Sequence, residues 1–196
     1  MKKVGVLALQ GDFAEHIIML EKMGVEVLPV KVPDQLKRID GLLIPGGEST
    51  TIGKLMQHYG LMQPIKDMAR QGFPLMGTCA GMILLAREAT DLNFPPVGAI
   101  DITVQRNAFG RQIDSFEVDL PVPVLGQELF HAVFIRAPFV KNINPAVKIL
   151  ARLADGAIVA ASQGRVLVAA FHPELTADIR LHRYFVEEMI NGNTGG

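Results

Sequence analysis

The chain has 196 residues, 49% of them hydrophobic and 20% charged, with 19 basic and 20 acidic side chains and a formal net charge of -1. This length suits one domain with a hydrophobic core, and the composition excludes a disordered chain. Balanced charge argues against nucleic-acid binding, and 6% aromatic residues without tryptophan argue against a stacking platform for single strands. A single cysteine cannot form an internal disulfide bond, so we expect a cytoplasmic protein.

Strands and helices alternate in the first half of the chain. Continuous apolar runs predict parallel strands that are buried on both faces, and segments with helical spacing lie between them. The predicted strands are residues 4–9, 25–30, 41–44 and 73–76, and the predicted helices are residues 13–23, 51–59, 61–71 and 80–88. This order predicts an α/β fold with a doubly wound, mostly parallel sheet flanked by helices. None of these apolar runs reaches the ~18 residues of a membrane span, so we expect no membrane contact.

The second half reads as short strands separated by turns rich in Gly, Pro, Asn and Asp. The predicted strands are residues 100–104, 116–120, 132–135, 147–153, 158–162 and 166–171. We expect some to be additional antiparallel strands and others to extend the main sheet. A closing helix over residues 176–191 precedes a tail at about 191–196 with a flexible composition. Without an internal repeat or linker, residues 1–196 form a single expected domain.

The segment Gly77-Thr78-Cys79-Ala80-Gly81 lies between a predicted strand and a predicted helix. This is the setting of a nucleophile elbow, in which a strained turn exposes the nucleophile and glycines let the chain pass closely. The helix N-terminus would stabilise a thiolate at this position. A lone cysteine is more often a small buried apolar residue, but the two glycines and the strand–turn–helix order favour a nucleophile.

A His-Pro-Glu segment directly follows the last predicted strand. A thiolate nucleophile needs a base that exchanges protons with the leaving group, and the imidazole needs an acceptor that fixes its tautomer. His172 and Glu174 could supply both groups at the carboxyl end of a strand, the edge where Cys79 also lies. The alternative is an incidental surface turn, which explains the tripeptide alone but not its combination with the elbow.

Three further features are less specific. Gly46 and Gly47 could point backbone N–H groups into an oxyanion hole, whereas the phosphate-loop and dinucleotide patterns are not met. Arg106 and Arg136 each follow a predicted strand and could bind a carboxylate, although a solvated arginine is the more common case. The histidines other than His172 lack metal-ligand spacing, so we expect no metal site.

Six segments together resemble class I, triad-type glutamine amidotransferases, and among them the glutaminase subunits of pyridoxal 5′-phosphate synthase. GGESTT, RNAFGRQ and FHPELT carry most of this resemblance, because other amidotransferases share the elbow. The resemblance covers nearly the whole chain and implies the fold of that class. The segments are residues 9–16, 45–51, 77–81, 106–112, 134–138 and 171–176.

The resemblance implies a Cys-His-Glu triad that hydrolyses L-glutamine to L-glutamate and ammonia. Cys79 would form a γ-glutamyl thioester, and His172, oriented by Glu174, would protonate the ammonia. The implied oxyanion donors are the N–H groups of Gly47 and Ala80. The implied glutamine-binding residues are Gly47, Glu48, Ser49, Arg106, Ile135 and Arg136.

The resemblance also implies a partner. The ammonia would pass to a separate (β/α)8-barrel synthase subunit in a large ring-shaped complex, which makes pyridoxal 5′-phosphate as its product, so no cofactor is expected here. Docking is expected to complete the oxyanion loop, so Gly46 and Gly47 should be conformationally labile and the isolated subunit weakly active. The alternatives are a glutaminase for another ammonia-using synthase, a docking module without turnover, and a cysteine redox or deglycase-like protein.

Overall fold

A computed structural model describes residues 2–106 and 115–192 of the chain. Its centre is a seven-stranded sheet with strand order β10-β11-β12-β4-β3-β1-β2. The five strands from β12 to β2 run parallel, and β11 and β10 are added in antiparallel pairing. The predicted α/β fold with a mostly parallel sheet is therefore confirmed. The strands are β1 (Lys3–Leu7), β2 (Glu26–Val30), β3 (Gly41–Ile44), β4 (Leu75–Thr78), β10 (Lys148–Arg152), β11 (Ile158–Gln163) and β12 (Val166–Ala169).

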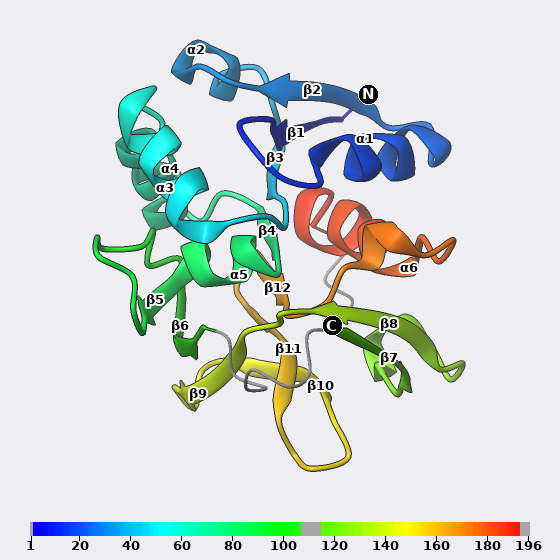
Figure 1. Ribbon diagram of the computed structural model, residues 1–196. Helices are drawn as coiled ribbons and strands as arrows, with labels where there is room; N and C mark the ends of the chain where they lie inside the picture. The colour runs from blue at the N-terminus through cyan, green and yellow to red at the C-terminus, as the bar shows by residue number, and fades with distance from the viewer. Residues whose placement is uncertain (1, 107–114, 193–196) are drawn as a thin grey trace.

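Helices cover both faces of this sheet, as the predicted doubly wound order requires. In Figure 1, α1, α6 and η3 lie on one face, and α3, α4 and α5 lie on the other. The helices are α1 (Phe13–Lys22), α2 (Pro33–Leu36), α3 (Ser49–His58), α4 (Met62–Arg70), α5 (Ala80–Leu85) and α6 (Arg180–Tyr184), which continues into the π-helix η3 (Phe185–Ile190). Two 3-10 turns are η1 (Pro123–Leu125) and η2 (Pro173–Leu175). Within the described ranges, no helix has the length and apolar character needed to span a membrane.

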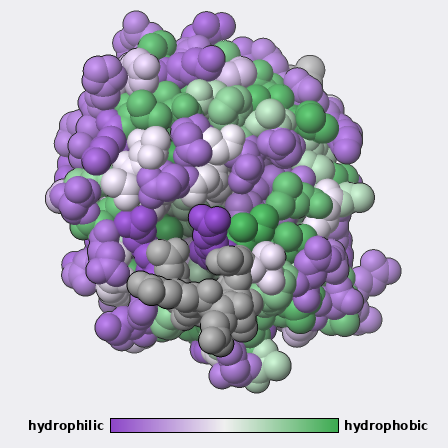
Figure 2. All heavy atoms as spheres, in the orientation of Figure 1, coloured by the Kyte–Doolittle hydropathy of each residue, from purple (hydrophilic) through white to green (hydrophobic). Residues whose placement is uncertain are grey.

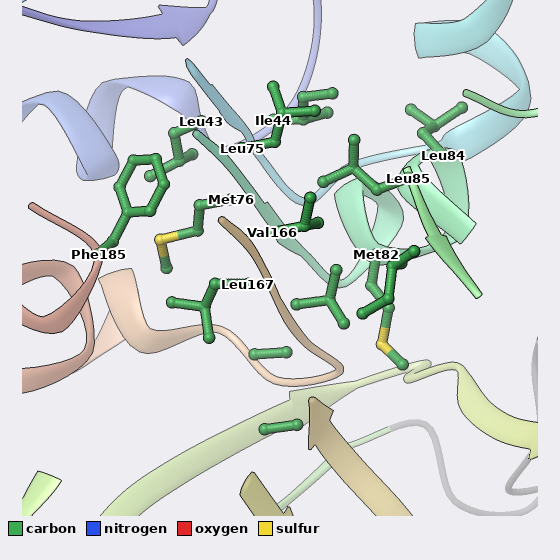
Figure 3. Close-up of a cluster of buried hydrophobic side chains, with 14 of the residues drawn as sticks. Leu43, Ile44, Leu75, Met76, Met82, Leu84, Leu85, Val166, Leu167 and Phe185 are labelled. Carbon is green, nitrogen blue, oxygen red and sulfur yellow. The ribbon is translucent and has the colours of Figure 1, made fainter. Parts of the chain in front are cut away.

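The core lies on both faces of the central strands. Leu43, Met76 and Leu167 are paired across β3, β4 and β12, and all three are fully buried. Figure 3 shows these side chains on the side of Phe185, whereas Leu75 and Val166 lie on the side of α5. Because side chains alternate along a strand, a strand that is covered on both faces must be apolar at every position. This explains why β3, β12 and the first three residues of β4 are continuous apolar runs.

Two small sheets flank the central one (Figure 1). One has the order β5-β6-β9, and the other is the antiparallel pair β7-β8. Phe116 and Phe134 stack across this pair with ring centroids 4.6 Å apart. On the face drawn in Figure 2, hydrophilic side chains cover most of the rim and apolar ones form smaller groups between them. The strands are β5 (Ala86–Ala89), β6 (Ile100–Gln105), β7 (Ser115–Leu120), β8 (Phe130–Ile135) and β9 (Phe139–Ile143).

Two predicted helices have different bounds in the structure. The helix predicted over residues 80–88 ends at Leu85, because residues 86–89 form β5 and Ala86 pairs with Ile100. The helix predicted from residue 176 begins at Arg180, because η2 occupies residues 173–175 and the Asp178 carboxylate accepts the Arg180 N–H. Strand β9 and the short helix α2 were not predicted. Of the predicted tail, residues 193–196 lie outside the described ranges.

Candidate active site

Cys79 occupies the tight turn between β4 and α5. Its φ of 48° and ψ of -104° lie in a region that side-chain-bearing residues seldom adopt, and strain of this kind gathers at functional sites. Its N–H donates to the Ala169 carbonyl at 2.8 Å, which fixes the turn to β12. A Cβ atom on Gly81 would lie 2.0 Å from the Ile44 carbonyl oxygen, and one on Gly77 would lie 2.6 Å from the Gly81 carbonyl. The elbow therefore needs both glycines, as its sequence predicted.

His172 and Glu174 lie at the carboxyl end of β12, next to β4. His172 Nδ1 is 2.7 Å from Glu174 Oε1, and the backbone N–H of His172 donates to the Val133 carbonyl at 2.8 Å. Because the carboxylate can only accept, Nδ1 donates to it, and Nε2 is the ring nitrogen left to give or take a proton. Nε2 is buried and has no hydrogen bond of standard geometry to a described residue.

The charges of the site favour a protonated His172. Burial alone would lower the pKa of His172, but hydrogen bonds and charges from Cys79 and Glu174 outweigh burial and raise it. The pKa of Glu174 is raised by burial, although the His172 contact opposes this change. Asp12 adds a second carboxylate, with Oδ2 3.4 Å from His172 Nδ1. Cys79 Sγ lies 3.8 Å from the Ile135 carbonyl oxygen, the end of β8.

A metal ion would compete with this arrangement. Asp12, His172 and Glu174 offer ligand atoms that lie within 4.8 Å of one another. His172 Nδ1, however, already donates to Glu174, and a metal at this nitrogen would have to displace the proton and break that contact. The chemistry of these residues therefore fits a proton-transfer pair better than a metal site.

The glycine loop after β3 lies against the imidazole. A Cβ atom on Gly46 would be 2.5 Å from His172 Cε1, so the loop backbone fits directly against the ring. The β1–α1 loop holds it: Asp12 N–H donates to the Gly46 carbonyl at 3.1 Å, and the side-chain oxygen of Gln10 accepts from Glu48 N–H at 2.9 Å. Gly47 has a φ of 144°, which favours glycine. No function was predicted for Gln10 or Asp12, although both lie in the resemblance segment 9–16.

Glu48 and Arg106, predicted as separate glutamine-binding groups, pair with each other. Arg106 Nη2 is 3.1 Å from Glu48 Oε1, and Nη1 donates to the Asp91 carbonyl at 2.8 Å. The Glu48 carboxylate also caps α3 by accepting from the N–H groups of Thr50 and Thr51. The pair therefore lies at the N-terminus of α3, one residue from Gly47.

The other predicted site residues lie on three different elements, α3, β8 and α5. Ser49 is buried in the first turn of α3. Ile135 and Arg136 are exposed at the end of β8, and Arg136 has a φ of 43° that turns the chain sharply. Ala80, predicted as an oxyanion donor, opens α5 directly after Cys79. The rest of the RNAFGRQ segment, residues 107–112, lies outside the described ranges.

Comparison with known proteins decides the family. The sequence model of the SNO glutamine amidotransferase family matches residues 6–191. The chain belongs to this family. Among the similar relatives of this amidotransferase are two proteins named "Pyridoxal 5'-phosphate synthase subunit PdxT". The one from Carboxydothermus hydrogenoformans is 55% identical over 190 residues, covering 97% of this chain and 99% of the relative. The one from Herpetosiphon aurantiacus is 57% identical over 186 residues, covering 93% and 98%.

Solved structures agree with the fold of this amidotransferase. One described as "Crystal structure of glutamine amidotransferase" has a TM-score of 0.88 at 49% identity and covers 94% of this chain and 97% of its own. The structure of PurLQS from Thermotoga maritima has a TM-score of 0.73 at 18% identity and covers 97% of this chain and 98% of its own. At that low identity the second likeness concerns the fold alone.

Replacing Glu48 tests the cap that it forms on α3. Burial would raise the pKa of Glu48, but hydrogen bonds from Thr51 and Thr50 outweigh it and lower the pKa to about 2. A lowered carboxyl pKa stabilises the fold above its unfolded value near 4.3, and this contribution is lost as the pH falls toward 2. Glu48→Gln should therefore lower the free energy of unfolding by about 1 kcal/mol at pH 7, and by about half as much at pH 3.

Urea unfolding at the two pH values measures this difference. Glu15→Gln on α1 is the matched control, because Glu15 is exposed and also lies in the first turn of its helix. An equal loss for Glu48→Gln at both pH values would contradict the assignment of the cap to the ionised carboxylate.

Proposed function

We propose that this protein is the glutaminase subunit of a pyridoxal 5′-phosphate synthase. It hydrolyses L-glutamine to L-glutamate and ammonia and supplies the ammonia to a separate synthase subunit in the cytoplasm. The observation that carries the proposal is Cys79 in a strained elbow beside a buried His172–Glu174 pair. The names of relatives that are 55% and 57% identical to this chain support pyridoxal 5′-phosphate synthase as the enzyme that receives the ammonia.

The reaction begins at the side-chain amide of glutamine. The Cys79 thiolate adds to the amide carbon, and the carbonyl oxygen becomes an oxyanion held by the N–H groups of Gly47 and Ala80. When the C–N bond breaks, the His172 imidazolium gives its Nε2 proton to the nitrogen, and ammonia leaves the thioester. His172 then takes a proton from water, which attacks the thioester and releases L-glutamate. Glu174 holds Nδ1–H throughout, so that Nε2 performs both transfers.

The backbone of glutamine is bound beside the glycine loop. Arg106 suits its α-carboxylate, and Glu48 suits its α-ammonium group. These two side chains pair with each other at 3.1 Å. When glutamine binds, Arg106 therefore has to turn from Glu48 to the α-carboxylate, and Glu48 has to turn to the α-ammonium group. The remaining contacts come from Gly47, Ser49 and the end of β8 at residues 135–136.

Docking controls the glycine loop. The synthase subunit is a (β/α)8 barrel in a large ring that carries glutaminases, and its docking completes the oxyanion hole at Gly47. The loop is suited to such a change because two consecutive glycines can shift their backbone angles at little steric cost. The isolated subunit is therefore weakly active.

The test measures glutamate and ammonia release from L-glutamine by the purified protein alone and with its synthase subunit. Release that rises on adding the subunit, and that Cys79→Ala removes, supports a partner-gated glutaminase. Equal activity with and without the subunit would contradict the gating. No release in either condition would overturn the proposed function and favour a docking or redox module.

A further inference from the structure

Two buried histidines lie behind the triad, on the side of Glu174 that faces away from His172. His16 comes from α1 and His182 from α6, and both side chains have 0% exposure. His16 Nδ1 lies 2.8 Å from His182 Nε2. His16 Nε2 lies 3.0 Å from Thr78 Oγ1 and 3.2 Å from Glu174 Oε2. These contacts connect the acid of the triad with the residue that precedes the nucleophile.

Both histidines are neutral at pH 7. Burial lowers the pKa of His182 to about 4. Burial also lowers the pKa of His16, and repulsion from His182 and His172 lowers it further. A neutral imidazole has one N–H donor and one acceptor nitrogen, so the contacts of the pair decide which nitrogen carries each proton.

Only one direction of donation fits these contacts. His16 Nε2 is hydrogen-bonded to Thr78 Oγ1, and Glu174 Oε2, which has no hydrogen bond of standard geometry to a described residue, lies 3.2 Å from the same nitrogen. A carboxylate oxygen attracts an N–H group and repels a lone pair, so His16 carries its proton on Nε2 and accepts on Nδ1. His182 then donates from Nε2 and keeps Nδ1 unprotonated. His182 Nδ1 is buried and has no hydrogen-bond partner among the described residues. The opposite direction would bury an N–H group there without an acceptor and turn a lone pair of His16 toward the carboxylate, and both are unfavourable.

We propose that His16 is a positioning residue of the triad: its Nε2–H, hydrogen-bonded to Thr78 Oγ1, also attracts the second carboxylate oxygen of Glu174, and His182 fixes the tautomer that makes this possible. The inference rests on the proposed function, because it extends the triad by two residues. Neither histidine contacts Cys79 or the glycine loop in any described interaction, so the effect of this pair on turnover passes through Glu174 and Thr78.

Removing this donor has a specific consequence. Without His16 Nε2–H, the buried Glu174 carboxylate loses a favourable contact, and its already raised pKa moves further up. Glu174 is then protonated over part of the working pH range and holds His172 less well. We expect kcat to fall at neutral pH and the acidic limb of the kcat–pH profile to move toward higher pH. KM for glutamine should stay near the wild-type value.

The experiment compares His16→Leu with His16→Gln in the complex with the synthase subunit. His16→Leu should lower kcat by roughly tenfold or more and shift the acidic limb. His16→Gln should recover most of both, because its amide N–H can reach the position of Nε2. Met19→Leu is the packing control, since Met19 is buried on the same helix. Wild-type kcat and pH profile in a folded His16→Leu variant, or equal losses in the Leu and Gln variants without a pH shift, would overturn the proposal.

A second measurement does not depend on activity. Nitrogen-15 NMR of labelled histidines should show His16 and His182 as Nε2–H tautomers that do not titrate between pH 5.5 and 8.5. His182→Leu should allow His16 to populate both tautomers. Titration of either ring, or an Nδ1–H tautomer at His16, would overturn the proposal. If the wild-type complex released no ammonia while the NMR result held, the proposed function alone would fail.

Discussion

Cys79→Ala should abolish glutamine hydrolysis while the protein stays folded and binds its synthase subunit. The loss should be at least about 10⁴-fold in kcat, because no other described group of the site can form the thioester and removal of a nucleophile costs this much or more in comparable enzymes. The fold should survive because alanine keeps the Cβ atom at a φ of 48° and adds no new strain. The substitution removes the weak interaction between Sγ and the Ile135 carbonyl oxygen at 3.8 Å and the interaction of the thiol with His172, and neither holds the turn itself.

Three measurements check this expectation: glutamate release in the complex, urea unfolding and the affinity for the synthase subunit. Cys79→Ser is the matched comparison, because its hydroxyl has nearly the size of the thiol but is a much weaker nucleophile at neutral pH. A loss of binding together with activity in Cys79→Ala would mean that the thiol has a structural function. Residual turnover near the wild-type level would exclude the cysteine mechanism.

Gly46→Ala should lower kcat by about 10²-fold with little change in global stability. The new Cβ atom would lie 2.5 Å from His172 Cε1, 3.0 Å from Nδ1 and 3.1 Å from Asp12 Oδ2, so the imidazole has to move. A displacement near 1 Å of a catalytic group can cost this much in rate. Alanine is compatible with the backbone here, because Gly46 does not have a positive φ.

Steady-state kinetics of the complex and urea unfolding separate the two effects of this substitution. Gly72→Ala is the control: Gly72 has a φ of 73°, and a Cβ atom added there would have no neighbour within 4 Å, so alanine strains the backbone without touching the site. We expect Gly72→Ala to lose stability and keep activity, the reverse of Gly46→Ala. Unchanged kcat in Gly46→Ala would show that His172 tolerates displacement by the loop.

The parts of the fold that sequence predicts well are those with a local signal. Continuous apolar runs located β3 and β12, and the glycines around Cys79 located the elbow. The end of α5 could not be predicted, because residues 86–89 are Ala, Arg, Glu and Ala, which favour a helix, and they form a strand only through pairing with β6. Strand β9 also pairs with β6, and no pattern in the sequence indicated this pairing.

Site residues that are close in sequence could be predicted to lie together, whereas those that are far apart in sequence could not. The pair His172 and Glu174 is visible in sequence because a single proline separates its members. The contact between His16 and His182 spans 166 positions, and each histidine alone resembles any other buried histidine. The pairing of Glu48 with Arg106 across 58 positions is equally invisible, since each charge also fits a direct contact with substrate.

Main-chain contacts hold the backbone of the elbow and so set the position of Cys79. Cys79 N–H bonds to the Ala169 carbonyl, and Gly81 packs against the carbonyl oxygen of Ile44 with no room for a methyl group. The apolar side chains that follow in α5 point into the core and take no part in these contacts. We therefore expect resistance to heat and the rate of turnover to vary independently along α5: replacing Met82 or Leu84 by a smaller apolar residue should lower the first and leave the second near its wild-type value.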